Sequence, residues 1–336
     1  MKNHDFASLR DADQDTLVLT APARTFQAPS SDSVRLLRNM VDAGGPEENE
    51  YALLDLLMAQ LYRMKQSGQL AETELAYLQS IFHDDFLANS IHGYVYRKPL
   101  GYAGDFRLID MIYTYHTFGH ENYEKWDQYF HYHAATDAVR NRKDFFKQQL
   151  LGKLDTRKAP LHLLNVASGP ARDLYELYTK IDPDKLVTTC VDIDANAIAF
   201  ATDLCSPYAE QINFHQKNIL RFSTAEKYDV IWSAGLFDYF EDRLFIMALK
   251  RLLTFLKPGG EILIGNFSQD NPSRGYMELF GEWFLIHRSP ETLIDLTLQA
   301  GVQPEHISVE QEPLGINLFL KIQSPVPAAQ VSLCMN

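Results

Sequence analysis

The sequence contains few cysteines: its 336 residues include three, Cys190, Cys205 and Cys334. Thiols so few and so scattered do not form a disulfide framework, and they predict a reducing compartment, so we expect a cytoplasmic protein. The spacing of the cysteines, histidines and acids does not match a metal site, and no metal is expected.

Basic residues are also in short supply, because 31 Lys and Arg face 44 Asp and Glu, a formal net charge of −13. A chain this acidic is repelled by phosphate backbones, which argues against a nucleic-acid partner. Long hydrophobic runs are missing as well. No apolar stretch approaches the roughly 20 residues that cross a bilayer, and the first residues contain no apolar signal core. We therefore expect neither membrane insertion nor secretion.

What is present is the composition of a globular chain, with 46% hydrophobic and 22% charged residues. The length suits a large domain with a substantial accessory region, or two domains. Residues 1–45 are polar and turn-rich and predict a flexible N-terminal arm, and residues 325–336 predict a poorly ordered tail. Residues 46–155 place apolar side chains at three- and four-residue spacing, which predicts a helical cap.

Between residues 156 and 324, short apolar runs alternate with amphipathic segments, which predicts an α/β domain with a doubly wound sheet. The first run, Leu161 to Ala167, leads into a turn of small residues at 168–171 and then a helical pattern. Ligands of such sheets bind at the carboxyl ends of the strands. Asp192 ends the second run, roughly 20 residues downstream, where an acid can accept the hydroxyls of a ribose. Asp194 is better explained as a helix N-cap.

Five segments resemble class I S-adenosylmethionine-dependent methyltransferases: NVASGPARD, CVDID, QKNIL, YDVIWSAGLFDYF and LKPGGEILIGNF, within about 161–323. The resemblance implies a seven-stranded Rossmann-like sheet with an antiparallel last strand, S-adenosylmethionine as cofactor, and methyl transfer as the activity. Three further segments, GYAGDFRLIDMIY, AVRNRKDFF and YMELFGEWFLIHRSPE, are similar to a bacterial group that includes 3-hydroxy fatty acid methyl ester synthases.

On the matching positions, the resemblance places Ala167, Gly169 and Ala171 beneath the methionine part of the cofactor, Asp192 on its ribose and Asn218 near its adenine amine. In the segment 101–105, two glycines flank an aromatic residue, and our hypothesis is that Tyr102 and Asp105 close on the methionine end. The alternative is a turn at the start of a helix, with Asp105 as its cap. The predicted cofactor contacts are Tyr102, Gly104, Asp105, Ala167, Ser168, Gly169, Pro170, Asp192, Ile193, Asn218, Ile219 and Ser233.

Methyl transfer from a sulfonium mainly requires alignment and exclusion of water, so a dedicated base is not obligatory. A carboxylate acceptor is already ionised at pH 7, and a thioether has no proton to lose. The candidate catalytic residues are Asp238, Tyr239, His131 and His133. The candidate acceptor contacts are Arg140, Arg142, Phe237 and Tyr276. The structural alternatives are hydrogen-bonded packing for the histidines and the rings, and salt bridges for the arginines.

The leading hypothesis is a methyltransferase that acts on a small molecule. O-methylation of the carboxylate of a hydroxy or fatty acid comes first, and S-methylation of a thioether such as methionine second. Because alanines replace the commoner glycines of the first turn, an alternative is a non-catalytic protein that binds S-adenosylmethionine as a sensor or partner subunit. A homodimer is also possible. A nicotinamide-linked dehydrogenase is disfavoured, since the Gly-x-Gly-x-x-Gly spacing is missing.

Overall fold

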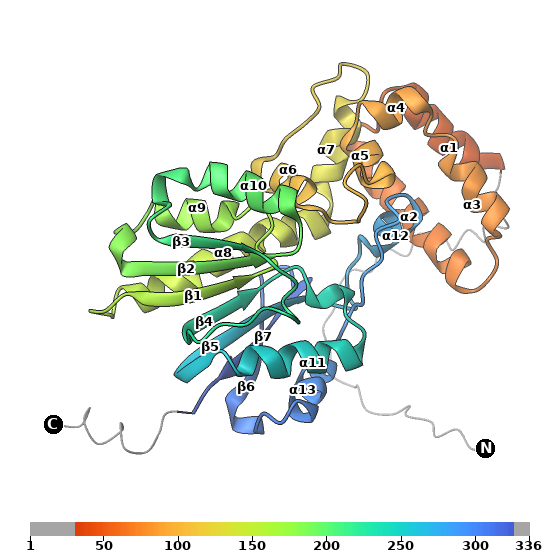
Figure 1. Ribbon diagram of the computed structural model, residues 1–336. Helices are drawn as coiled ribbons and strands as arrows, with labels where there is room; N and C mark the ends of the chain where they lie inside the picture. Colours follow the sequence, from red (N-terminus) through yellow and green to blue (C-terminus); the bar gives the residue numbers. More distant parts are fainter. Residues whose placement is uncertain (1–30, 326–336) are drawn as a thin grey trace, which may run out of the picture.

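The computed structural model describes residues 31–325 (Figure 1). The first thirty residues of the predicted arm, and all but the first residue of the predicted tail, lie outside this range. The rest of the predicted arm differs from the expectation, because it forms helix α1 (Ser31–Asp42). Leu37, Met40 and Val41 lie on one face of α1 and are buried in the core of the cap. Burial of this apolar stripe explains why the segment folds.

The helical cap is confirmed, and its aromatic residues fill its own core. Phe82, Phe86 and Trp126 pack against one another with ring centroids 5.1 to 5.6 Å apart. No helix within residues 31–325 is long and apolar enough to cross a membrane. After α1, the cap elements are η1 (Glu48–Glu50), α2 (Tyr51–Gln66), α3 (Glu72–Gln79), α4 (Asp84–Ala88), α5 (Ile91–Arg97), α6 (Phe106–Thr114), α7 (Glu124–Tyr132) and α8 (Ala134–Leu154).

The rest of the chain is a seven-stranded sheet in the order β3-β2-β1-β4-β5-β7-β6. Neighbouring strands are parallel except at β7, which runs antiparallel to both β5 and β6. The predicted doubly wound sheet with an antiparallel last strand is therefore confirmed. The strands are β1 (Leu161–Val166), β2 (Leu186–Asp192), β3 (Ile212–Gln216), β4 (Tyr228–Ser233), β5 (Leu256–Phe267), β6 (Ile307–Gln311) and β7 (Asn317–Gln323).

Helices cover both faces of the sheet (Figure 1). One face packs against α8, α9 (Arg172–Tyr178) and α10 (Ala195–Leu204), and the other against α11 (Asp242–Leu253) and α13 (Pro290–Gln299). Each face has its own apolar core, as expected of a sheet buried on both sides. The remaining short elements are η2 (Pro183–Lys185), η3 (Ser206–Tyr208), η4 (Phe237–Tyr239), α12 (Arg274–Leu279) and η5 (Pro304–His306).

The chain crosses between cap and sheet more than once, so the cap is not a purely N-terminal unit. After β5, the segment that contains α12 returns to the cap and packs on α2 (Figure 1). Tyr276, Phe280 and Trp283 of this segment are buried in the cap core. In the other direction, α8 begins in the cap and sends Phe146 and Leu150 into the core beneath the sheet. These two connections fix the cap over the carboxyl ends of the strands.

Candidate functional site

A cavity of about 570 Å³ lies between the cap and the carboxyl ends of β1, β2 and β4. A doubly wound sheet binds its ligands at this edge. The sheet contributes the turn after β1, the end of β2 and the residues that follow β4, while the cap contributes the segment 102–113, one side of α8 and residues 282–285.

The turn after β1 brings its backbone close to the cavity through an unusual conformation. Ala167, Gly169 and Ala171 have positive φ angles of 53°, 53° and 51°. A left-handed conformation costs a residue with a side chain about 1–2 kcal/mol, so the two alanines hold strain at this turn. A Cβ added at Gly169 would meet only Phe106 Cβ, at 4.0 Å. Open space therefore lies above Gly169, where a ligand would pass.

Asp192 ends β2 and lines the same cavity. Its carboxylate accepts hydrogen bonds from the N–H groups of Gly169 at 2.8 Å and Asp194 at 2.9 Å. Burial raises the pKa of Asp192, while these N–H donors act to lower it. A carboxylate has about four lone-pair sites, so the two hydrogen bonds leave acceptors for the two hydroxyls of a ribose. Ile193, 66% exposed, follows on the rim.

Asp194 has two partners, of which the sequence suggested one. Its Oδ1 accepts from Asn196 N at 2.8 Å, the expected N-cap of α10. Its Oδ2 accepts from the Tyr102 hydroxyl, also at 2.8 Å. The second contact joins the segment 101–105 of the cap to the end of β2. Tyr102 and Gly104 both line the cavity.

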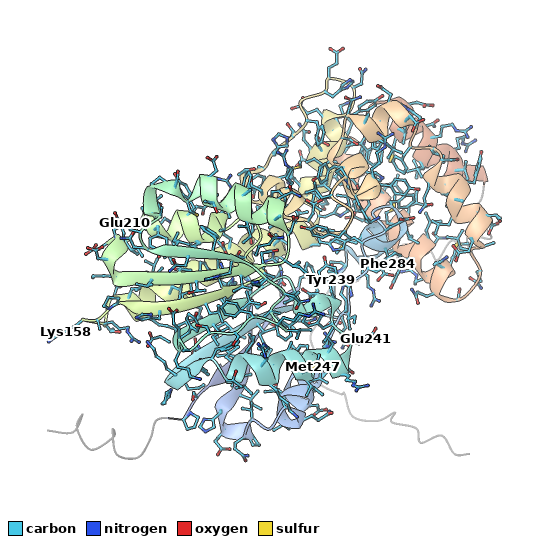
Figure 2. All side chains as sticks on the ribbon, in the orientation of Figure 1. Lys158, Glu210, Tyr239, Glu241, Met247 and Phe284 are labelled. Atoms are coloured by element: carbon cyan, nitrogen blue, oxygen red, sulfur yellow. The ribbon has the colours of Figure 1, made fainter. Side chains whose placement is uncertain are left out.

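The hydroxyl of Tyr239 ties three segments together at the mouth of the cavity, where cap and sheet meet (Figure 2). It donates to the carbonyl of Ala103 at 3.0 Å and accepts from Trp283 Nε1 at 2.9 Å. Gly104, with φ of 68°, is required here, because an added Cβ would lie 2.5 Å from Tyr239 Oη. Phe284, 62% exposed, completes the rim beside Trp283.

Asp105 caps the start of a helix, which is the alternative that the sequence left open. It is buried and caps α6 by accepting from Leu108 N at 2.9 Å, and the Tyr94 hydroxyl lies 3.2 Å from both carboxylate oxygens. Its side chain does not line the cavity. A contact of Asp105 with the cofactor therefore stays a prediction.

Arg142, on α8, is the cation of the cavity lining and is 5% exposed. Its Nη1 donates to the carbonyl of Ala234 at 2.8 Å, and its Nε has no hydrogen-bond partner among residues 31–325. Asp173 and Asp238 line the same cavity, and burial raises the pKa of each to about 6, against the opposing pull of Arg142. Asp238 is held by the N–H of Phe267, which donates to Oδ1 at 2.6 Å.

Arg140 and His131 lie away from the cavity, in the cap. Arg140 donates to the His131 carbonyl at 2.7 Å and stacks 4.0 Å above the ring of Tyr115. His131 Nε2 is 2.7 Å from the carbonyl of His116, and burial lowers the pKa of this histidine. Both side chains have the structural surroundings that the sequence offered as the alternative.

His133 and Tyr276 line a second, smaller cavity inside the cap, with their rings 4.2 Å apart. Tyr276 Oη is 2.7 Å from His92 Nδ1.

The remaining predicted contacts are divided between the cavity and its surroundings. Ser168 and Pro170 line the cavity with the turn, but Ser233, Ile219 and Phe237 are buried outside its lining. Asn218 lies in a neighbouring groove that shares Ile193 with the cavity, and its Oδ1 accepts from Leu220 N. The structure does not bring Asn218 into the main cavity, so its contact with adenine stays a prediction.

The structure adds cavity residues that the sequence reasoning missed, among them Asn165 and Asp173. Asp173 had a usable signal, because it follows the small-residue turn in the first turn of α9. Trp283 lies far along the chain from this turn and reaches the cavity by packing in the cap.

S-adenosylmethionine fits this lining in chemistry. The cofactor carries a sulfonium, an ammonium and one carboxylate, and the lining offers Asp173, Asp192 and Asp238 against Arg142. Asn165 Nδ2 and Ser168 Oγ are buried in residues of the lining and lack hydrogen-bond partners among residues 31–325. Buried polar groups normally have partners, so a polar ligand is expected here.

Comparisons with known proteins agree with this reading. Residues 163–260 match the family described as a methyltransferase domain. No curated protein matches the chain. A solved structure of a possible exported protein from Bordetella parapertussis is 17% identical, with a TM-score of 0.57, over 88% of this chain and 95% of that one. It is similar in fold across both cap and sheet.

Two further solved structures match a smaller part of this chain and have lower TM-scores. N-methyltransferase NodS from Bradyrhizobium japonicum WM9, in complex with S-adenosylhomocysteine, is 21% identical over 54% of this chain and 87% of its own, with a TM-score of 0.39. The 1,6-didemethyltoxoflavin N1-methyltransferase of Burkholderia thailandensis is 17% identical over 56% of this chain and 80% of its own, with a TM-score of 0.42.

The strand order, the turn after β1 and the domain match at residues 163–260 together define a Rossmann-like methyltransferase fold, here with a helical cap. Residues 163–260 are therefore a methyltransferase domain, and the lining of the cavity suits S-adenosylmethionine as the cofactor.

Proposed function

We propose that the enzyme O-methylates the carboxylate of a small acceptor with an apolar body, such as a hydroxy or fatty acid. Arg142 carries this proposal. It is a buried cation with an N–H that lacks a partner among residues 31–325, and it lies in a cavity whose cap side is otherwise largely apolar. Arginine binds carboxylates through strong, charge-assisted hydrogen bonds.

The cavity residues divide the work between cofactor and acceptor. In this proposal Asp192 accepts hydrogen bonds from the ribose hydroxyls, and Asp173 binds the ammonium group. Arg142 holds one oxygen of the acceptor carboxylate and leaves the other free to attack. Bound S-adenosylmethionine would supply an electrophilic methyl group: a bond would form between oxygen and the methyl carbon as the carbon–sulfur bond broke, and the electron pair of that bond would stay on sulfur. No proton has to leave, so positioning and exclusion of water supply the acceleration.

The apolar side chains of the cavity suit the body of such an acceptor. Val139, Phe267 and Leu285 line its cap side and are buried. At the mouth, the hydrogen bonds that join Ala103, Tyr239 and Trp283 hold the cap segment in place.

A second candidate is an acceptor that loses a proton, and Asp238 is the observation that favours it. This acid lines the cavity, and its pKa of about 6 suits a general base at neutral pH. With such an acceptor, kcat/KM would rise with pH through about 6 and collapse in Asp238→Asn. A carboxylate acceptor predicts no rise from Asp238 between pH 6 and 8.

The deciding experiment measures release of S-adenosylhomocysteine with hydroxy and fatty acids, methionine and other thioethers, phenols and amines. Mass spectrometry identifies the methylated product. Arg142→Gln should raise the KM for a carboxylate by about 10- to 100-fold, because a hydrogen bond to a charged group contributes about 1.5–3 kcal/mol. Arg142→Lys keeps the charge and should lose less. A weakened affinity for S-adenosylmethionine, with the acceptor KM unchanged, would assign Arg142 to the cofactor instead.

We also propose a cytoplasmic location, in keeping with the buried free thiols of Cys190 and Cys205. Burial raises the pKa of both thiols, which keeps them protonated and unreactive. Fractionation of cells that express the tagged protein tests this location.

A further inference from the structure

The main cavity has a neighbour deeper in the cap. This second cavity, of about 20 Å³, is called the terminal chamber below. Val139, Phe267 and Trp283 line both spaces, so these three side chains form the wall between them. All three are buried and come from different segments: α8, the end of β5, and the stretch after α12.

The lining of the terminal chamber is mainly hydrocarbon, including Val95, Ile112, Phe130, Ala135 and Met277. Its three hydroxyl groups already have partners: Thr136 Oγ1 donates to the His133 carbonyl at 2.7 Å, Ser273 Oγ accepts from Ala135 N at 3.1 Å, and Tyr276 Oη is 2.7 Å from His92 Nδ1. His133 Nε2 lacks a hydrogen-bond partner among residues 31–325, and a single such atom does not satisfy a water. A buried water needs two to four polar partners, and a chamber of this size holds about one water-sized group. The surroundings favour an apolar group over a water.

We infer that Val139, Phe267 and Trp283 form a gate, and that the apolar tail of the acceptor passes it to place its terminal methyl group in the terminal chamber. The chamber then sets the longest tail that the enzyme accepts. This inference rests on the proposed function, because Arg142 must hold the other end of the same acceptor. Because Arg142 fixes the carboxylate, the distance from Arg142 to the terminal chamber sets the length of acceptor that fits.

Trp283 connects the gate to the mouth of the main cavity. Its ring lines both spaces, and its Nε1 donates to Tyr239 Oη, the hydroxyl that also binds the carbonyl of Ala103. A tail of the right length therefore packs against the same ring that holds the cap segment over the cofactor. A shorter tail leaves that contact unmade.

The test compares straight-chain carboxylates of increasing length on two variants that change the chamber in opposite directions. Ala135→Val fills the chamber, and Met277→Ala enlarges it. Ala138→Val and Met64→Ala are matched controls, because both residues are buried in the cap core outside either cavity lining. Affinity for S-adenosylmethionine, measured without acceptor, should stay within twofold of the original chain in all four.

Ala135→Val should shift the preferred chain length down by one or two carbons, and Met277→Ala should shift it up. Each methylene group of the acceptor that becomes buried in the chamber, or is excluded from it, should change KM by about fourfold. The two controls should keep the original length profile. If Ala135→Val does not fold, the upward shift in Met277→Ala decides alone.

The failures are distinguishable. Carboxylates that are methylated with the same length profile in both chamber variants would overturn the gate and leave the proposed function standing. An enzyme that binds S-adenosylmethionine but methylates no carboxylate would overturn the proposed function, and the gate with it.

Discussion

Three residues of the turn after β1, Ala167, Gly169 and Ala171, have the left-handed backbone conformation. Glycine adopts this conformation freely and alanine does not. The turn keeps this shape because its neighbours fix it: Ala167 N donates to the Val191 carbonyl at 2.8 Å, and Gly169 N donates to Asp192. The strain thus lies at the point where the backbone borders the main cavity. The positions of the two alanines show that the fold tolerates a methyl group in this conformation.

Gly169→Ala should fold, and its binding of S-adenosylmethionine should fall by at least tenfold. The backbone cost is about 1 kcal/mol, as for any alanine at positive φ, and the new methyl group would occupy the space above the turn. Gly68→Ala is the control, because Gly68 also has positive φ, has open space around it and lies between α2 and α3, outside the cavity lining. Calorimetric titration and thermal melts check both. Equal losses of affinity in the two variants would contradict the assignment.

Asp192→Ala should weaken S-adenosylmethionine binding by about 10- to 150-fold, because a hydrogen bond to a charged acceptor contributes about 1.5–3 kcal/mol and the ribose would lose it. Asp182→Ala is the control, since Asp182 caps η2 beside the opposite end of β2. The dissociation constant for S-adenosylmethionine is the measurement. A normal affinity in Asp192→Ala would rule out its contact with the ribose.

At the scale of elements, α8 decides which of two arginines reaches the cavity. Residues two apart on a helix point about 200° away from each other, so Arg140 and Arg142 cannot face the same space. The sequence predicted the helix over Ala135 to Leu150 but left both arginines as candidates. The structure turns Arg142 toward the cavity and Arg140 toward Tyr115, because Phe146 and Leu150 must face the sheet.

The segment 101–105 is the second decisive element, since it covers the cavity and is tied to β2 by the bond from Tyr102 to Asp194. Tyr102→Phe should speed the release of S-adenosylmethionine by about fivefold while changing stability by less than about 0.5 kcal/mol, because the ring is 41% exposed and its ion-assisted bond is partly screened. Tyr115→Phe, outside the cavity lining, is the control. Stopped-flow displacement measures the rate, and an unchanged rate would contradict a closing role.

The described part of the molecule consists of a helical cap and a sheet domain that share one cavity, and the buried histidines of the cap include His92 and His133. Burial lowers the pKa of each to about 3. In the unfolded chain a histidine binds a proton near pH 6.5, whereas the buried histidines stay neutral until about pH 3. Their contribution to the free energy of unfolding is therefore complete above pH 6.5 and is lost as the pH falls toward 3. Asp173 and Asp238 have a pKa raised to about 6, so the folded state takes up their protons before the unfolded state does. Their contribution to stability therefore grows as the pH falls from about 6 to about 4 and offsets the loss from the histidines.

The comparison of His133→Phe with the original chain isolates one histidine from this balance. As the pH falls from 6 to 4, the free energy of unfolding of the variant should rise relative to that of the original chain, by up to about 2.7 kcal/mol, since each pH unit contributes up to about 1.36 kcal/mol. Urea unfolding at several pH values measures the difference. A difference that stays constant over this interval would contradict the buried, neutral state of His133.

The sequence alone determined the doubly wound sheet, the turn after β1 and the place of Asp192, while the class of the enzyme came from the resemblance of five segments to a known family. The sheet, the turn and the place of Asp192 depend on hydrophobic period and on spacing within one strand–turn–helix unit, which local backbone geometry fixes. Asp194 as a cap and the helical cap itself follow from the same local rules.

Only the tertiary structure decided which distant side chains meet. It brought Trp283 and Phe284 to the mouth of the cavity, turned Arg142 inward, and placed His131 and His133 in the cap instead of the main cavity. It also folded residues 31–42 onto the cap, although their polar surroundings suggested an arm. The physical reason is that each of these outcomes depends on how one apolar face packs against another, and packing joins segments whose separation along the chain carries no local signal.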